Sequence, residues 1–313
     1  MRTGRQDLRQ IVARRMHGAE PMRVTLIHNP SAGDGRMPDR DDVVEAIEDL
    51  GWKVAPFDKR ELDAALEKPG EAVLVAGGDG IVGKVAKRLA GSGVPMGIVP
   101  TGTANNVART LGIGVDARAA IDVLSRAAVR DVDMGCVVQG KGRGEPFLEG
   151  FGVGIFAWVM AERATEKHKK LRRAFRLIAK ELAGYAPHRA RIEVDGRDVS
   201  GEYLLAAVMN LRSLGPALGL APDASFDDGQ LDVVLVRPEH REALRAHLKR
   251  ASLEGDITLP RFEVYRGEHV RISGHGNWAH VDDCPREFEG DVEASVDPGA
   301  VKFLVPAGDT MTA

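Results

Sequence analysis

The chain has 313 residues, which is long enough for two domains with separate hydrophobic cores. Its formal net charge of −3 excludes a general basic surface of the kind that binds nucleic acid, so we expect no nucleic-acid partner. Two cysteines, Cys136 and Cys284, are too few for a disulfide framework and match no zinc or CxxC spacing. The simplest expectation is a reducing, cytoplasmic location.

The N-terminal segment, residues 1–22, is basic. It has no apolar stretch typical of a secretory signal, and no apolar run in the chain is long enough to span a bilayer. We interpret the segment as a polar leader or a short surface helix, with a basic helix that touches a membrane as the alternative. The arginines involved are Arg2, Arg5, Arg9, Arg14 and Arg15.

Residues 23–130 alternate between strand and helix patterns, which predicts an α/β domain with a parallel, three-layer arrangement. Val- and Leu-rich runs indicate the strands, and apolar residues at helical spacing indicate the helices. The expected strands are 23–28, 52–57, 72–76 and 95–99, and the expected helices are 40–50, 61–67 and 81–91.

A glycine-rich loop, Gly77-Gly78-Asp79-Gly80, follows the apolar run 72–76 and precedes the expected helix 81–91. Glycine permits positive φ and lets another molecule approach the backbone closely. The exposed amides and dipole of a helix N-terminus favour phosphate. The carboxylate of Asp79 in such a loop suits a magnesium ion, a ribose hydroxyl or the proton of an attacking alcohol.

Two more loops of small polar residues, 29–36 and 100–109, follow the first and fourth expected strands. Taken alone, the first is more typical of an ordinary strand-to-helix turn than of a phosphate-binding loop. In a parallel sheet, however, such loops emerge at the same edge, where ligands bind. Neither GxxxxGK[ST] nor a GxGxxG in the first turn is present. The three loops together predict a nucleotide site of another kind.

From residue 131 to 298 the pattern changes to short strand-like runs separated by Gly, Asp and Pro, which predicts an antiparallel β-sandwich domain. Two helices interrupt it, 158–183 and 238–250. The first is strongly basic and is either a solvated surface helix or a helix that rests on an anionic membrane surface. The expected strands are 132–138, 147–153, 190–194, 203–210, 231–236, 262–264, 269–273 and 278–282, with one more at 301–305 beyond this segment.

Two acidic clusters lie in this half. The stretch from Asp223 to Asp232 contains four aspartates before a strand. Carboxylates and turn carbonyls are the ligands that magnesium or calcium prefers. An Asp-Gly turn explains part of the pattern equally well. The second cluster, 280–285, has the composition of a turn.

The ordered motifs of the chain resemble the diacylglycerol kinase catalytic family, and more closely its soluble bacterial lipid kinases. The resemblance covers residues 23–305, although the glycine–aspartate loop by itself also occurs in NAD kinases and 6-phosphofructokinases. The motifs are NPSAG at 29–33, GGDG at 77–80, PTGTANN at 100–106, LAPDASFDDGQLD at 220–232 and VDD at 281–283.

This resemblance implies an α/β nucleotide domain and a β-sandwich lipid-substrate domain, with the active site in the cleft between them and segment 299–306 rejoining the first domain. It implies transfer of the ATP γ-phosphate to a lipid hydroxyl with Mg²⁺. The metal would bind Asp228 and the backbone carbonyls of Ser225 and Gln230. The basic helix 158–183 would dock on an anionic leaflet. The nucleotide candidates are Asn29, Ser31, Gly33, Gly77, Gly78, Asp79, Gly80, Thr101, Thr103 and Asn105.

The chain departs from the family pattern at five positions, and the most important one is Cys284. The family has a glutamate there as the proposed general base, and a thiol with a pKa of about 8.5 is a poor base at neutral pH. Asp283 and Asp79 are therefore our catalytic candidates. The departures are Ile81, Lys84, Asn106, Phe156 and Cys284.

Three functions follow as hypotheses. The first is an ATP- and Mg²⁺-dependent kinase of a diacylglycerol-like lipid, peripheral to the membrane. The second is a nucleotide- or lipid-binding protein of the same fold that has lost catalysis and acts as a sensor or scaffold. The third is a NAD kinase. A homodimer stays an open alternative, because no coiled-coil seam or apolar stripe decides the oligomeric state.

Overall fold

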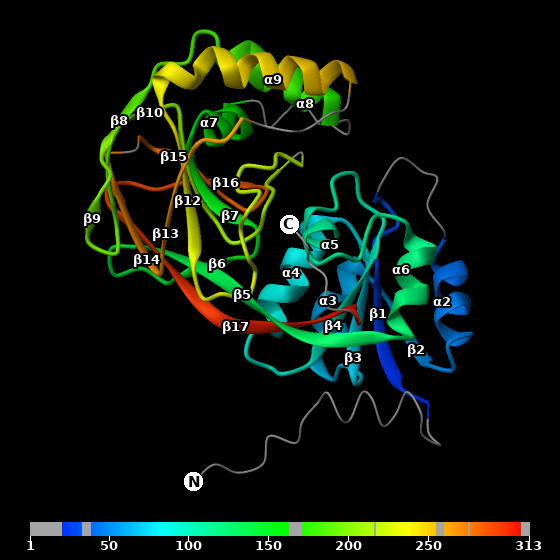
Figure 1. The fold of residues 1–313 in the computed structure, drawn as a ribbon. Coiled ribbons are helices and arrows are strands. Elements are labelled where there is room, and N and C mark those ends of the chain that lie inside the picture. The colour runs from blue at the N-terminus through cyan, green and yellow to red at the C-terminus, as the bar shows by residue number, and fades with distance from the viewer. Residues whose placement is uncertain are drawn as a thin grey trace. The chain divides into compact units, whose positions relative to one another are not determined.

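The computed structural model describes residues 21–32, 39–162, 171–215, 217–254, 260–274 and 276–307. The chain divides into two compact units (Figure 1). The N-terminal unit comprises Met1–Val132 and Ala300–Ala313, and the C-terminal unit comprises Asp133–Gly299. Residues 1–20, for which a basic leader is predicted, lie outside the described residues.

The N-terminal unit contains a parallel sheet, as predicted, and its strands lie in the order β2-β1-β3-β4. Strand β3 is buried along its whole length because its apolar side chains face helices on both sides. The last strand of the chain, β17, pairs in parallel with β4 through Lys302 and Phe303. The strands are β1 (Arg23–His28), β2 (Lys53–Asp58), β3 (Ala72–Gly77), β4 (Pro95–Pro100) and β17 (Val292–Pro306).

Helices cover both faces of this sheet, which confirms the α/β class: α2 and α6 lie on one face and α4 on the other (Figure 1). Helix α4 begins two residues earlier than predicted, because Gly78 is extended and forms the N-cap. The helices are α2 (Arg40–Glu48), η1 (Lys59–Glu61), α3 (Leu62–Glu67), α4 (Asp79–Leu89), α5 (Asn106–Thr110) and α6 (Ala117–Leu124).

The C-terminal unit is an antiparallel β-sandwich, as predicted. One sheet has the order β13-β12-β11-β7-β15-β16, and the other includes β10-β8-β14-β17. A buried apolar core fills the space between them, formed by alternating residues such as Val233 of β12 and Ile192 of β8. The strands are β5 (Ala127–Gln139), β6 (Glu145–Phe147), β7 (Gly150–Gly154), β8 (His188–Val194), β9 (Arg197–Asp198), β10 (Gly201–Tyr203), β11 (Leu205–Met209), β12 (Leu231–Val236), β13 (Glu263–Gly267), β14 (His269–Ser273), β15 (Trp278–Val281) and β16 (Cys284–Glu287).

A helical layer covers the outer face of the six-stranded sheet (Figure 1). It consists of α7 (Ile155–Glu162), α8 (Leu171–Glu181) and α9 (Arg241–Glu254), the last preceded by η2 (Pro238–His240). The helix predicted over 158–183 corresponds to α7 and α8. Residues 163–170, which lie between them in the sequence, are outside the described residues. Helix α7 starts directly after Gly154, whose φ of +102° ends β7, and it is mostly buried rather than basic.

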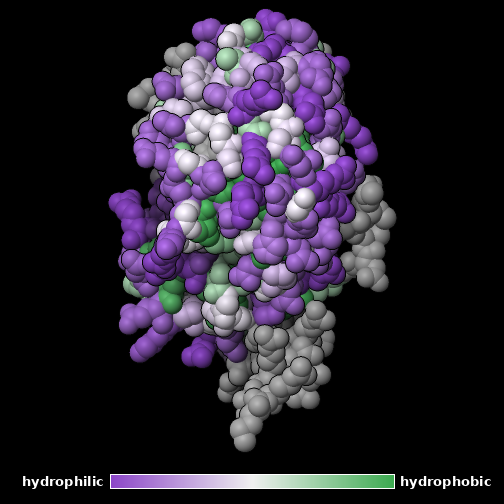
Figure 2. Space-filling model, turned by 90° about the vertical axis from the view of Figure 1, so that its left-hand side faces the viewer, coloured by the Kyte–Doolittle hydropathy of each residue, from purple (hydrophilic) through white to green (hydrophobic). Residues whose placement is uncertain are grey.

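The surface is predominantly hydrophilic on the face drawn in Figure 2, with apolar residues visible in small areas between polar ones. Among the described residues the large apolar side chains that are exposed are Val115, Leu253 and Val264. None of the helices within the described ranges is both long and apolar enough to cross a bilayer.

Candidate active site

The three predicted loops meet at the carboxyl edge of the parallel sheet. The strands end in register, with His28 opposite Ala76 and Gly77 opposite Pro100. The backbone N–H of Asn29 donates to the carbonyl of Ala76 at 2.9 Å, and that of Thr101 donates to Gly77 at 3.0 Å. Backbone hydrogen bonds therefore join the three strand ends to one another just where the loops begin.

Two of the loops pack backbone against backbone at Gly78 and Gly102. A Cβ atom added to Gly78 would lie 2.9 Å from the Cα of Gly102, and one added to Gly102 would lie 2.4 Å from the Cα of Gly78. Neither distance is sterically permitted, so both positions require glycine. Their approach fixes the relative position of the second and third loops.

Asp79 is the first residue of α4 and links the same two loops. Its Oδ1 accepts a hydrogen bond from the backbone N–H of Val107 in α5 at 3.0 Å. Gly78, the N-cap of α4, offers no side-chain acceptor to the first turn of the helix. The N-terminus of this 11-residue helix, with its partial positive charge, therefore lies among the three loops that begin at residues 29, 77 and 100. We call these three loops the loop cluster.

Three of the predicted nucleotide residues, Gly77, Thr101 and Asn105, are buried. Asn105 has a left-handed backbone with φ of +52°, and its side chain bonds both the N–H and the carbonyl of Gly102, at 2.9 and 3.0 Å. Gly77 leaves no room for a Cβ, which would meet the Cγ2 of Ile81 at 2.1 Å. Thr101 is buried, and its Oγ1 has no hydrogen-bond partner within the described ranges.

The other candidates are more accessible. Ser31 and Thr103 are exposed, while Asn29, Gly78, Asp79 and Gly80 are half-buried. The Oδ1 of Asn29 accepts from the backbone N–H of Ser31 at 3.1 Å and so shapes the first loop. Gly33 lies outside the described residues. The hydroxyls of Ser31 and Thr103 are thus the side-chain groups most available to a ligand at this edge.

In the C-terminal unit, Asp282 and Asp283 form the two-residue turn between β15 and β16, where Val281 pairs with Cys284. Asp282 is only 7% exposed and has φ of +51°. Its Oδ1 accepts from three backbone N–H groups, those of Leu148 at 3.0 Å, Glu149 at 2.8 Å and Gly150 at 3.3 Å. This carboxylate is committed to holding the turn in place.

Asp283, the predicted catalytic acid, is exposed at the same turn. Its neighbour Cys284 is half-buried, and the thiol donates to Asp283 Oδ1 at 3.4 Å. Burial, followed by the negative charge of Asp283, raises the pKa of the Cys284 thiol. The thiol is therefore protonated at neutral pH and cannot replace a glutamate as a base, whereas the turn leaves the Asp283 carboxylate accessible.

The predicted metal ligands lie in one loop before β12. The Oδ1 of Asp228 accepts from the backbone N–H of Gln230 at 3.1 Å. Buried Asp133 closes the loop, because its two oxygens accept from the N–H groups of Gly229 and Gly299, each at 2.7 Å. Burial raises the pKa of Asp133, and the nearby carboxylates of Asp228 and Asp227 add to this effect.

This concentration of hard oxygen atoms fits Mg²⁺, provided that backbone carbonyls contribute. Within the described ranges no group of three His, Cys, Asp or Glu side chains could hold a metal by itself. The carbonyls of Ser225 and Gln230 would have to complete the set around Asp228. A competing cation is close by, since Nη1 of Arg266 lies 3.9 Å from Oδ2 of Asp228.

Sequence reasoning missed three residues that shape these sites: Asp133, Asp282 and His280. Asp133 lies in β5, and no recognisable sequence motif surrounds it that could have pointed to its role. His280 is fully buried on β15, and burial lowers its pKa to about 4. A Cβ on Gly152 of the neighbouring strand would lie 2.5 Å from its Nε2. The Asp-Asp pair within a strand–turn–strand pattern was a usable signal for Asp282, because aspartate tolerates a left-handed turn position.

Comparison with known proteins supports the arrangement over almost the whole chain. Residues 23–137 match the diacylglycerol kinase catalytic domain, and residues 150–305 match the YegS C-terminal NAD kinase beta sandwich-like domain. A diacylglycerol kinase from Mycobacterium tuberculosis is 28% identical over 91% of this chain and 95% of its own length. A protein from Pseudomonas aeruginosa described as a YegS-like lipid kinase is 31% identical, covering 81% of this chain and 82% of its own.

The fold is also found in solved structures. A crystal structure from Bacillus anthracis, described as a diacylglycerol kinase, superimposes with a TM-score of 0.73 at 20% identity and covers 93% of this chain and 97% of its own. At that identity the likeness concerns the fold alone. The two domain matches and the relative from Pseudomonas aeruginosa show that the chain belongs to the diacylglycerol kinase family of lipid kinases.

Proposed function

We propose that this protein is a kinase that transfers the γ-phosphate of ATP to the hydroxyl group of a diacylglycerol-like lipid and depends on Mg²⁺. The observation that carries the proposal is the linked loop cluster of the N-terminal unit. The Gly78–Gly102 contact and the Asp79–Val107 hydrogen bond hold a helix N-terminus, the Thr103 hydroxyl and a carboxylate at one sheet edge, and the Asn29–Ala76 backbone hydrogen bond joins the start of the Ser31 loop to the same edge. The lipid acceptor is supported by the names of the relatives.

Phosphoryl transfer depends mostly on positioning and on stabilisation of charge. The N-terminus of α4 would orient phosphate groups, while Ser31 and Thr103 would bind the nucleotide through their hydroxyls. In the C-terminal unit, Asp228 and the carbonyls of Ser225 and Gln230 would hold Mg²⁺. Bound there, the ion would supply positive charge that neutralises the acidic loop and keeps it in one conformation.

Asp283 would take the proton from the lipid hydroxyl. It is the accessible acid of the 282–283 turn, whereas Asp282 is occupied by backbone N–H groups and Cys284 is protonated. A general base contributes about 10²- to 10⁴-fold in rate. The position of a carboxylate one residue before the family's glutamate would therefore lower turnover without removing the capacity for transfer.

The lipid would be reached from an anionic membrane surface on which α8 rests. Phe175, Ile178 and Ala179 of α8 are buried, while Arg172 and Arg176 on its other side are exposed. A basic outer face of this kind binds anionic headgroups. In a sedimentation assay, an Arg172→Gln/Arg176→Gln variant should bind phosphatidylglycerol vesicles several-fold more weakly than the wild type. Equal binding of wild type and variant would exclude this surface.

Labelled ATP and a panel of diacylglycerols, ceramides and polyprenols test the activity directly. We expect an extractable labelled phospholipid that requires Mg²⁺ and is lost on addition of a chelator. An Asp79→Ala variant should produce far less, because Asp79 links two of the nucleotide loops. Demonstrable ATP binding without a labelled product from any lipid would refute the kinase proposal.

A second candidate is a nucleotide- or lipid-binding protein that no longer catalyses transfer. The protonated Cys284 in place of a glutamate favours it. Cys284→Glu separates the two functions: a wild type that turns over at a rate near that of the Glu variant is a kinase, and a wild type that is inactive beside an active Glu variant is not. The C-terminal match is also named after NAD kinases, so NADP formation from NAD and ATP should be measured in parallel.

A further inference from the structure

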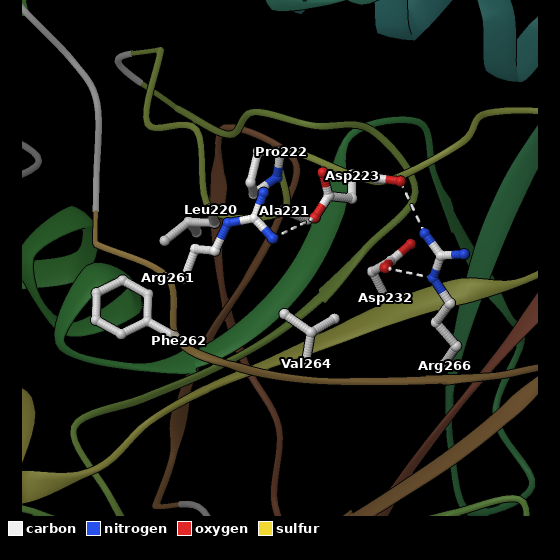
Figure 3. Close-up of a pocket in the computed structure, with 9 residues that line it drawn as sticks. All are labelled: Leu220, Ala221, Pro222, Asp223, Asp232, Arg261, Phe262, Val264 and Arg266. Carbon is white, nitrogen blue, oxygen red and sulfur yellow. Dashed lines mark hydrogen bonds and ion pairs between the residues drawn. The ribbon is translucent and has the colours of Figure 1, made fainter. Parts of the chain in front are cut away.

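A cavity of about 530 Å³ opens at the edge of the six-stranded sheet in the C-terminal unit (Figure 3). Its floor comes from β12 and the edge strand β13. These strands are antiparallel, with Asp232 opposite Arg266 and Val234 opposite Val264, and directly opposed residues share one face of a sheet. Asp232, Val264 and Arg266 therefore point to the same side, and segment 220–223 forms a wall beside them.

The charged groups of this cavity already have partners of opposite charge. Nη1 of Arg261 lies 3.3 Å from Oδ2 of Asp223, and Nε of Arg266 lies 3.0 Å from Oδ1 of Asp232. Arg266 also donates from Nη2 to the backbone carbonyl of Asp223 at 2.7 Å. Because the carboxylates of Asp223, Asp232 and nearby Asp228 already pair with the two guanidinium groups, an anionic ligand would have to displace existing ion pairs. The charge pattern favours an uncharged ligand.

One polar atom of a lining residue lacks a partner. Asp232 is 2% exposed, and although its Oδ1 bonds Arg266, its buried Oδ2 has no hydrogen-bond partner in the part of the chain that the structure describes. Asp232 lies between Asp223 and Arg266 in the cavity (Figure 3). A buried carboxylate oxygen without a donor is unfavourable. A ligand that brings a hydroxyl group would satisfy it.

The rest of the lining is apolar. Leu220, Phe262 and Val264 surround the polar groups, and Val264 is 42% exposed although it lies on the sheet face that the helices cover elsewhere. A large apolar side chain left exposed beside a cavity is typical of a ligand site. The cavity therefore combines one unsatisfied hydrogen-bond acceptor with an apolar wall.

We propose that this cavity binds an uncharged amphiphile whose hydroxyl group donates to Oδ2 of Asp232 while its apolar body packs against Leu220, Phe262 and Val264. Glycerol ethers and monoacylglycerols have this chemistry. The site lies wholly within the C-terminal unit and does not depend on phosphoryl transfer. Its test is a binding measurement without nucleotide, so its failure would leave the proposed kinase activity unaffected.

Isothermal titration of the full-length protein with 1-O-octylglycerol, below its critical micelle concentration, tests the site. We expect saturable binding that weakens about 10- to 100-fold when both hydroxyls of the probe are methylated, as befits loss of a hydrogen bond to a charged acceptor. Octyl sulfate, which has the same chain but an anionic head, should also bind more weakly. This comparison of probes requires no change in the protein.

Val264→Glu provides an independent test because it places a charge on the apolar wall. We expect at least a tenfold loss of octylglycerol affinity. Val115→Glu is the matched control: Val115 is 44% exposed in the N-terminal unit, and this variant should bind like the wild type. Thermal unfolding of both variants verifies folding. Absence of saturable binding, equal affinity for the methylated probe, tighter binding of octyl sulfate, or wild-type affinity of a folded Val264→Glu variant would each overturn the proposal.

Discussion

The loop cluster of the N-terminal unit and the Asp282–Asp283 turn of the C-terminal unit are built on different principles. The loops are positioned by backbone: Gly78 lies against Gly102, and main-chain hydrogen bonds join the strand ends. The turn is positioned by one side chain, because Asp282 binds three N–H groups of the 148–150 segment. A backbone-built site tolerates many side chains around it, whereas a turn of two adjacent acids leaves only one free for chemistry.

Gly102→Ala should produce the largest effect, because its Cβ would lie 2.4 Å from the backbone of Gly78. We expect a loss of about 3 kcal/mol in the free energy of unfolding and at least a 100-fold loss of ATP affinity. Urea unfolding and a nucleotide-binding titration measure the two. Gly184→Ala is the control, since a Cβ there meets nothing within 4 Å. Normal ATP binding by Gly102→Ala would show that the two loops need not pack this closely.

Asp282→Asn should destabilise the protein by about 2.5 kcal/mol, while Asp283→Asn should change stability by less than about 0.5 kcal/mol. Asparagine tolerates the left-handed backbone of position 282 and keeps one acceptor oxygen for the three N–H groups, so the substitution isolates the loss of the negative charge that strengthens these hydrogen bonds. Urea unfolding measures the free energy of unfolding of both variants and so compares the structural roles of Asp282 and Asp283. Similar losses in both would contradict the division between a structural and an accessible acid.

His280 should make the C-terminal unit sensitive to acid. Burial lowers its pKa to about 4, below the unfolded value of 6.5, so its neutral form stabilises the fold fully above pH 6.5 and this contribution is lost as the pH falls towards 4. Between pH 7 and pH 5 the loss is about 2 kcal/mol. His280→Leu should remove this part of the pH dependence in urea unfolding. Identical slopes for variant and wild type would rule out the effect.

Asp79→Ala should have a smaller effect on stability than the losses expected for Gly102→Ala and Asp282→Asn, about 1 kcal/mol, from loss of the acceptor for Val107 N–H and of a negative charge at the N-terminus of α4. Asp79→Asn keeps an acceptor oxygen and should retain most of that stability. Thermal unfolding of the three proteins provides the comparison. If the alanine and asparagine variants were equally stable, the link between the second and third loops would not depend on this side chain.

The parallel sheet and its loops could be predicted from sequence because strand burial, glycine and turn residues are local signals. The sequence did not reveal that Gly77 is obligatory because of Ile81, or that Asn105 bonds Gly102 rather than facing outward. Those roles follow from the folded path of each loop, because both contacts join residues three or four positions apart in the same loop and helix start. The start of α7 at Ile155 was predicted three residues too late, because the positive φ of Gly154 that ends β7 cannot be told from the sequence alone.

The acids of the C-terminal unit were the hardest to assign. In the sequence, Asp282 and Asp283 are adjacent carboxylates that cannot be told apart. In the folded turn, Asp282 is buried and accepts hydrogen bonds, whereas Asp283 is exposed. Asp133 carries no motif signal, and the motif that ends in Asp232 does not reveal its partner. The partners, Gly229 and Gly299 for Asp133 and Arg266 for Asp232, come from distant parts of the chain. Long-range pairing of this kind cannot be read from local spacing.

The most direct measurement is the single-turnover rate of phosphoryl transfer to diacylglycerol at saturating ATP and Mg²⁺, for the wild type and for Asp283→Asn. If Asp283 replaces the missing glutamate as the base, the variant should be slower by about 10²- to 10⁴-fold, with ATP affinity and stability unchanged. A variant that transfers phosphate as fast as the wild type would contradict this account of the site.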